Sequence, residues 1–168
     1  GWGYDVNRTS PDESNSQFAV LALWEASKLG VAIPEDCIEK GLRYWKNRHL
    51  GNGWGYATAR GVSGSMTCAG IASMLILRDA AEGVDARVIG DQLKCCGGQA
   101  REVDPVELSM RWLSDSFSIS SNPGGEGAWN MYYLYALERV GRLTGQRFIG
   151  SVDWYRAGAE HLLKIQDE

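Results

Sequence analysis

The most reactive side chains in this chain are two adjacent cysteines, Cys95 and Cys96, which are followed by Gly97, Gly98 and Gln99. An ionised thiol is a nucleophile, so both cysteines are possible reactive thiols. Adjacent cysteines bond to each other only under strain, which argues against a redox pair. The two glycines more simply indicate a turn that ends a helix, and we favour this structural interpretation.

A second group of polar and aromatic side chains lies near the predicted starts of helices and forms the predicted ligand-binding site. If those helix starts meet, their side chains line the mouth of a cavity or its inner face. Capping of helix ends and of loop backbone is the structural alternative for the polar members. The predicted site residues are Tyr4, Asp5, Asn15, Gln17, Tyr56, Thr67, Trp129, Asn130 and Tyr133.

Residues that bind metals are sparse and scattered along the chain. Asp36 and Cys37 are adjacent, and the two histidines are His49 and His161. A zinc site needs three or four converging ligands, so we expect no metal and no other cofactor. Cys37 is instead predicted to be a small hydrophobic residue on a helix.

Composition and charge exclude several classes of protein. The chain has 168 residues, of which 44% are hydrophobic, and a net charge of −4, which fits one folded domain. Its Lys and Arg residues are scattered, so no basic stripe is available for nucleic acid. No apolar run reaches the roughly 20 residues that cross a bilayer, and no targeting segment is visible. The 4 cysteines do not make a disulfide framework at this length, which leaves the cellular compartment open.

Hydrophobic periodicity predicts an all-α chain of about six helices, without a convincing strand. Ser14, Asn15 or Ser16 is predicted to cap the first helix, and Pro34 with two acidic residues opens the second. The predicted helices span about 14–30, 34–49, 65–81, 104–117, 127–143 and 152–165.

The tetrapeptide Gly-Trp-Gly-Tyr occurs twice, at 1–4 and at 53–56. Such recurrence indicates repeated supersecondary units, here about three helical hairpins. The middle unit carries an insertion at about 83–102, and the third enters its helix directly from Trp129, without the loop of the other two. The three units, in one repeat domain, span about 1–52, 53–126 and 127–168.

The two helices of each hairpin differ in their distribution of apolar residues. The first is apolar around most of its circumference and rich in small residues, as at 69–73. The second has a single apolar stripe, formed by Ile38, Leu42 and Trp45 in one unit and by Leu108, Trp112 and Leu113 in the next. This pattern predicts inner helices that are wrapped by outer helices.

The Gly-Trp-Gly-Tyr sequences and the stretch SNSQFAVLAL at 14–23 resemble the repeats of squalene-hopene cyclases and protein prenyltransferase β subunits. The resemblance implies an α/α toroid, of which this chain would form an arc. In the cyclases a Gln near the end of each outer helix and a Trp in the next loop join neighbouring repeats. Gln166 keeps that pattern, whereas Arg48 and Ser116 stand at the two earlier positions. The chain looks like a fragment of a larger toroid, so other repeats or a second copy are expected to cover exposed inner-helix surface.

The catalytic patterns of both families are absent from this sequence. The cyclases use an Asp-x-Asp-Asp acid, and no Asp-x-Asp occurs here. The prenyltransferases hold zinc with an Asp-x-Cys step and a His, whereas Asp36 and Cys37 are directly adjacent. Cys96 to Gln99 is similar to the Cys-Gly-Glu-Gln thioester of complement-like toroids, but Gly98 replaces the Glu.

These observations predict a non-catalytic repeat module that binds a hydrophobic small molecule or a peptide, or that acts as a scaffold in a larger protein. One alternative is part of a cyclase-like or prenyltransferase-like enzyme whose catalytic residues lie outside this sequence. A third interpretation is a thioester or thiol-reactive toroid domain based on Cys96 and Gln99.

Overall fold

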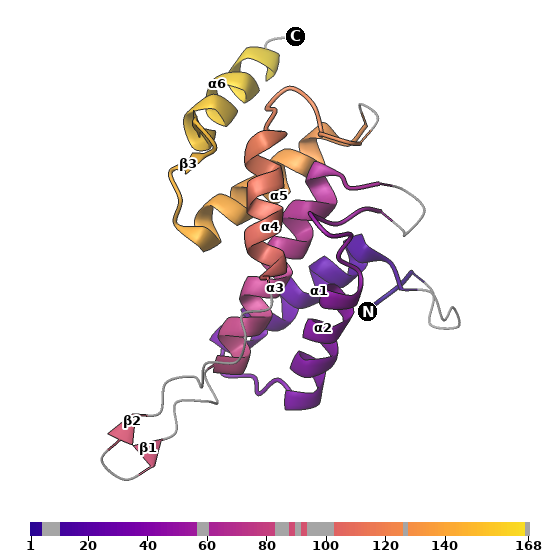
Figure 1. The fold of residues 1–168 in the computed structure, drawn as a ribbon, viewed down its shortest axis with the longest axis vertical. Coiled ribbons are helices and arrows are strands. Elements are labelled where there is room, and N and C mark those ends of the chain that lie inside the picture. The colour runs from indigo at the N-terminus through magenta and orange to yellow at the C-terminus, as the bar shows by residue number, and fades with distance from the viewer. Residues whose placement is uncertain are drawn as a thin grey trace.

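The chain is mostly helical in a computed structural model, and Figure 1 shows its helices as coiled ribbons. The structure describes residues 1–4, 11–56, 61–82, 88–89, 92–93, 103–125 and 128–166. The helices in these ranges are α1 (Glu13–Lys28), α2 (Glu35–Asn47), α3 (Gly64–Glu82), α4 (Pro105–Asp115), α5 (Asn130–Thr144) and α6 (Trp154–Gln166). The strands are β1 (Val88–Ile89), β2 (Gln92–Leu93), β3 (Phe148–Ile149) and β4 (Val152–Asp153).

Helix α3 is the centre of the fold and packs against α1, α2, α4 and α5 (Figure 1). Every residue from 64 to 74 is buried, as expected for a helix that is apolar on all sides. Small residues let neighbouring groups approach closely. A Cβ added at Gly70 would lie 2.2 Å from the ring of Trp54, so only glycine fits there.

The predicted division into inner and outer helices is only partly met. Helices α1 and α5 flank α3, while α2 and α4 also pack on α3 and α6 packs on α5. Burial on all sides is confirmed for α3 but is wrong for α1, where Phe18 and Ala22 are exposed. The reason is that, among the described helices, α1 shares an extensive interface only with α3.

The apolar faces of the outer helices lie close to the predicted stripes. In α2, Ile38 and Trp45 are buried, as predicted. In α4 the buried residues are Val106, Ser109 and Leu113, so the buried face is centred beside the predicted one. The predicted stripe residues Leu108 and Trp112 lie at the edge of this face and are only partly buried.

Two caps differ in how well the sequence predicted them. Asp12, rather than Ser14, Asn15 or Ser16, caps α1, and its carboxylate accepts a hydrogen bond of 2.9 Å from the Asn15 amide. The prediction was wrong by one turn because Ser14 to Ser16 already have helical backbone. At α4 the sequence signal is confirmed, since Asp104 caps a helix that has a proline in its first turn.

The prediction that the chain has no strand is wrong, because two short antiparallel ladders occur. Strands β1 and β2 pair within the predicted insertion, and β3 and β4 pair just before α6. The β3–β4 hairpin turns at Gly150, whose φ of +60° suits glycine. Strands of two residues are too short to produce the alternation by which sequence patterns indicate a strand.

The ends of the insertion are held together by one ion pair. Arg78, near the end of α3, binds Asp104, the cap of α4, through two hydrogen bonds of 2.9 and 2.7 Å. Such a planar fork fixes orientation as well as distance. The Arg78 guanidinium also lowers the pKa of the Asp104 carboxyl group.

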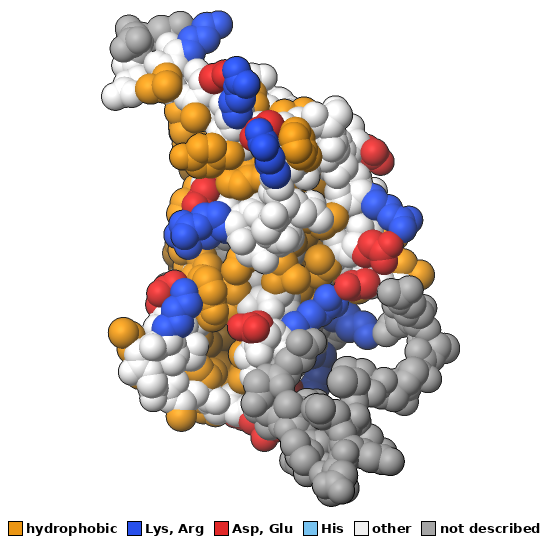
Figure 2. Space-filling model, turned by 90° about the vertical axis from the view of Figure 1, so that its left-hand side faces the viewer, with side chains coloured by type: hydrophobic (Ala, Val, Ile, Leu, Met, Phe, Trp, Pro, Cys, Tyr) orange, Lys and Arg blue, Asp and Glu red, His pale blue; other side chains and the backbone are white. Residues whose placement is uncertain are grey.

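Hydrophobic side chains remain exposed on the surface away from α3. Figure 2 shows them gathered along one face, between paired basic and acidic side chains. On α6 no residue is fully buried, and Tyr155, Leu162 and Leu163 are exposed.

Candidate functional site

The first turns of α1, α3 and α5 border a cavity of about 660 Å³. This volume lies within the range of about 300–1,000 Å³ that is usual for small-molecule sites. The three helices are separated in the sequence and meet because α1 and α5 both pack against α3. The described residues that line the cavity are Tyr4, Ser14, Phe18, Tyr56, Gly61, Ser63, Ser65, Met66, Asn122, Gly124, Gly125, Ala128, Trp129 and Tyr132.

Five aromatic side chains, which we call the aromatic wall, dominate this lining. Two of them are strongly exposed toward solvent, Tyr4 at 82% and Trp129 at 76%. Phe18 and Tyr132 lie against each other, with ring centroids 6.3 Å apart. The aromatic wall consists of Tyr4, Phe18, Tyr56, Trp129 and Tyr132.

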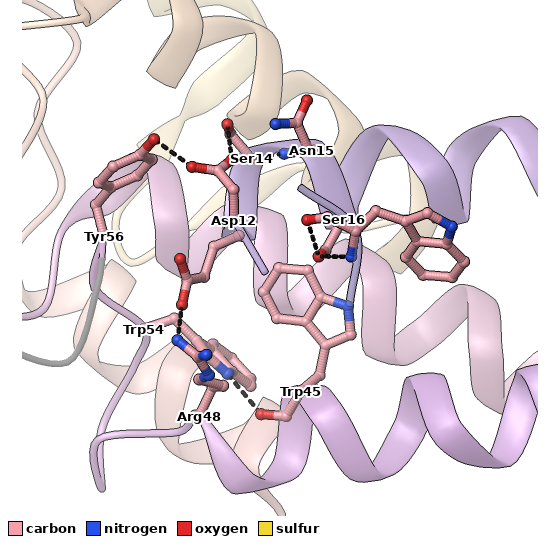
Figure 3. Close-up of polar contacts among 10 residues, drawn as sticks. Asp12, Ser14, Asn15, Ser16, Trp45, Arg48, Trp54 and Tyr56 are labelled. Atoms are coloured by element: carbon pink, nitrogen blue, oxygen red, sulfur yellow. Dashed lines mark hydrogen bonds and ion pairs between the residues drawn. The ribbon is translucent and has the colours of Figure 1, made fainter. Parts of the chain in front are cut away.

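Asp12 is held beside this wall by three hydrogen bonds (Figure 3). Its Oδ1 atom accepts from the Ser14 hydroxyl at 2.5 Å and from the Asn15 amide at 2.9 Å. Its Oδ2 atom accepts from the Tyr56 hydroxyl. Desolvation opposes ionisation of Asp12, but the hydrogen bonds from Ser14 and Tyr56 outweigh it and lower the pKa of this carboxyl group. Asp12 is therefore ionised at neutral pH.

Two tyrosines of the wall, Tyr56 and Tyr132, stay protonated over a wide pH range. The hydrogen bond to Asp12, with burial, raises the pKa of Tyr56 to about 12. Burial is the main cause of the raised pKa of Tyr132, and the charges of Asp12, Tyr4 and Tyr56 add to it. Tyr4, Tyr56 and Tyr132 line the same cavity, and Asp12 lies beside it through its bond to Tyr56.

The two Gly-Trp-Gly-Tyr loops are anchored by the same device. The Trp2 amide donates to the Ser16 hydroxyl at 2.9 Å, and that hydroxyl donates back to the Trp2 carbonyl at 3.3 Å. The Trp54 amide donates to Thr67 Oγ1 at 3.2 Å, and the hydroxyl donates back to the Trp54 carbonyl at 3.3 Å. Each hydroxyl lies in the first two turns of the helix that follows its loop. This device sets the position of Tyr56, two residues after Trp54.

The Trp54 side chain joins α2 to α3, because its ring lies against Gly70 of α3. Its indole Nε1 atom donates to the Trp45 carbonyl, in the last turn of α2, at 2.8 Å (Figure 3). Its ring also contacts that of His49 edge to face, with centroids 4.6 Å apart. At the position where the cyclase repeats have Gln, Arg48 instead forms an ion pair with the buried Glu13 of α1.

The predicted site residues fall into two groups in the structure. Tyr4, Tyr56 and Trp129 line the cavity together. Gln17 is fully buried behind it and accepts a hydrogen bond of 2.7 Å from the Tyr132 hydroxyl. Asn15 contributes its backbone amide to the Asp12 carboxylate.

Three further predicted residues, Thr67, Asn130 and Tyr133, do not line the cavity. Thr67 and Tyr133 are fully buried in the core. Asn130 donates to the Ile119 carbonyl at 3.3 Å. Asp5, Cys95 and Cys96 lie outside the described residues, as does the rest of the predicted thioester motif.

Sequence reasoning missed several parts of the site. Phe18 and Tyr132 are not among the predicted site residues, yet both line the cavity. Asn122 was not identified at all. Its side chain accepts from the Ser65 amide at 2.9 Å and donates to the Ser65 hydroxyl at 3.1 Å, which fixes the start of α3. The run Asn-Pro-Gly-Gly at 122–125 is a turn signal that could have pointed to it.

No three His, Cys, Asp or Glu side chains within the described ranges are grouped so that they could hold a metal ion. Among the same residues, no helix has the length and apolarity needed to cross a membrane. Compared with protein-family models, curated proteins and solved structures, the chain has no significant match to any of the three.

Proposed function

We propose that this chain is an arc of three helical hairpins from an α/α toroid of the squalene cyclase and prenyltransferase type, and that it binds a small hydrophobic ligand. The adjacent packing of α1, α3 and α5 supports the arc, because their first turns border one cavity. The packing of α2 and α4 on α3, and of α6 on α5, is what an outer layer requires. The repeated anchoring of Trp2 and Trp54 supports an origin in equivalent units.

The observation that carries the binding function is the cavity of about 660 Å³ with its aromatic wall. Aromatic side chains supply large contact areas that lose little conformational entropy on binding. Trp129 and Tyr4 are exposed far more than core residues of their size, and their exposure leaves apolar area that a ligand can cover. A ligand of small-molecule size would remove this area from water.

A neutral fluorescent probe such as Nile red tests the proposal. We expect the probe to bind with enhanced fluorescence, and Phe18→Ala to weaken binding by about tenfold, which corresponds to about 1.4 kcal/mol. Tyr155→Ala is the matched control, because Tyr155 is an exposed aromatic residue on α6, outside the cavity lining. Equal loss with both variants, or no loss with Phe18→Ala, would overturn the proposed site.

A further inference from the structure

The charge distribution around the cavity is one-sided among the described residues. None of the described lining residues is Lys, Arg, His, Asp or Glu. A carboxylate lies directly beside the wall, that of Asp12, which accepts a hydrogen bond from the Tyr56 hydroxyl. Glu13, the next residue, is neutralised by its ion pair with Arg48. The negative charge of Asp12 is therefore not neutralised by any described side chain that lines the cavity.

The aromatic rings add to this negative potential. The face of an aromatic ring carries negative charge and attracts a cation that lies within about 6 Å of the ring centroid. A phenol that donates its proton to a carboxylate is polarised further, because hydrogen bonds in a chain strengthen one another. Tyr56 is such a phenol, since its hydroxyl donates to Asp12.

The positive ends of the neighbouring helices cancel this field only in part, although no side chain caps the start of α5. The positive end of α1 is occupied by the Asp12 carboxylate, which accepts from the Asn15 amide. At α3 the Asn122 side chain accepts from the Ser65 amide. The remaining partial charges, about half a unit per helix, fall off within one turn, whereas Asp12 carries a full charge.

From these observations we infer that the cavity selects an organic cation, a quaternary or methylated ammonium group, which packs against the aromatic wall and is drawn by the Asp12 carboxylate. This inference rests on the proposed function and names the chemical class of the ligand for the same cavity. An ammonium group whose methyl groups face the rings loses little hydration on entry, so both the cation–π attraction and apolar contact favour binding. An anion in the same position would be repelled by the Asp12 carboxylate.

Two probes that have the same shape but differ in charge show how much of the affinity is due to charge. Choline carries a trimethylammonium group, and 3,3-dimethylbutan-1-ol replaces its nitrogen with carbon and is neutral. Calorimetric titration of the chain with both probes, at pH 7 and low salt, is expected to give at least about tenfold tighter binding of choline. Raising the salt concentration is expected to reduce this difference, because exposed charges are screened.

Substitution of Asp12 then tests the source of the selectivity. Asp12→Asn keeps a side chain that caps helices well and removes the charge. We expect it to lower the affinity for choline by about fivefold and to leave that for 3,3-dimethylbutan-1-ol unchanged. Asp36→Asn is the control, because Asp36 is an exposed carboxylate on α2 that pairs with Lys40.

Each outcome decides between the two proposals. Equal affinity for both probes, or a preference for choline that Asp12→Asn leaves intact, would overturn the inference and leave the proposed cavity function standing. The same holds if Nile red binds in the cavity and choline does not displace it. If Nile red itself fails to bind in a manner that depends on Phe18, the proposed function fails and the inference fails with it.

Discussion

Substitution of Thr67 by Val should lower the free energy of unfolding by about 2 kcal/mol. Thr67 is fully buried, and its hydroxyl accepts a hydrogen bond from the Trp54 amide. Val has nearly the same shape but no acceptor, so the Trp54 amide loses its partner, and an unsatisfied buried donor costs about 1–3 kcal/mol. The second bond adds little to the loss, since the Trp54 carbonyl still accepts from the Ser63 amide at 3.0 Å.

The assay is urea unfolding followed by far-ultraviolet circular dichroism. For a slope of about 2 kcal/mol per molar urea, the midpoint should fall by about 1 M with an unchanged slope. Ser16→Ala is the matched variant, because Ser16 holds Trp2 by the same pair of bonds. Trp2 is 38% exposed, so water can replace the lost acceptor, and the expected decrease is below about 1 kcal/mol.

Two results would refute this reasoning. One is a free energy of unfolding for Thr67→Val that lies within about 0.5 kcal/mol of that of the unaltered chain. An effect of that size is usual for substitutions on the surface, so the hydroxyl would then not anchor the loop. If Ser16→Ala is as damaging as Thr67→Val, exposure does not distinguish the two anchors.

Three further predictions follow from the same contacts. Trp54→Phe should lower the free energy of unfolding, measured by thermal unfolding, by about 2–4 kcal/mol, because the indole hydrogen bond is lost and a cavity is left behind. Trp2→Phe should lower it by less than about 1 kcal/mol. Equal effects of the two variants would contradict the difference in burial. The raised pKa of Tyr56 stabilises the fold below pH 10.0, and this contribution is lost as the pH rises through about 12, so absorbance titration should show a tyrosinate step near pH 12 that Tyr56→Phe removes, while the buried Tyr132, whose pKa is also raised, still titrates late. Arg48→Met should cost about 2–3 kcal/mol because it leaves the Glu13 carboxylate buried without a partner, and adding Glu13→Gln should recover part of the loss; no recovery in denaturant melts would count against the ion pair.

The helices were predictable because their signals are local. The periodicity of α2 and the Asp-Pro start of α4 each lie within a few residues, so the predicted ranges and the observed ones agree closely. The central position of α3 followed from its small and apolar composition. The cap of α1 was misplaced because several consecutive polar residues can each accept a hydrogen bond from a first-turn amide.

The composition of the site was less predictable because it depends on which helix starts meet. Tyr4, Tyr56 and Trp129 could be placed near a cavity from their position before helices. The membership of Phe18 depends on how α1 and α5 meet, because its ring packs against those of Tyr132 and Tyr135. The bond between Tyr56 and Asp12 joins residues 44 positions apart, and no local pattern specifies it.

The bidentate ion pair between Arg78 and Asp104 makes the segment between α3 and α4 a suitable place for the insertion of another protein sequence. Both ends of that segment are already fixed by contacts outside it, so the helices do not depend on its length. Doubling the length of a flexible loop costs only about 0.6 kcal/mol in closure entropy. A reporter domain inserted between 83 and 102 should therefore leave the unfolding transition of the helices near its original temperature. A large fall in that temperature would mean that the segment supports the fold. A probe attached there leaves the described lining residues of the cavity unaltered.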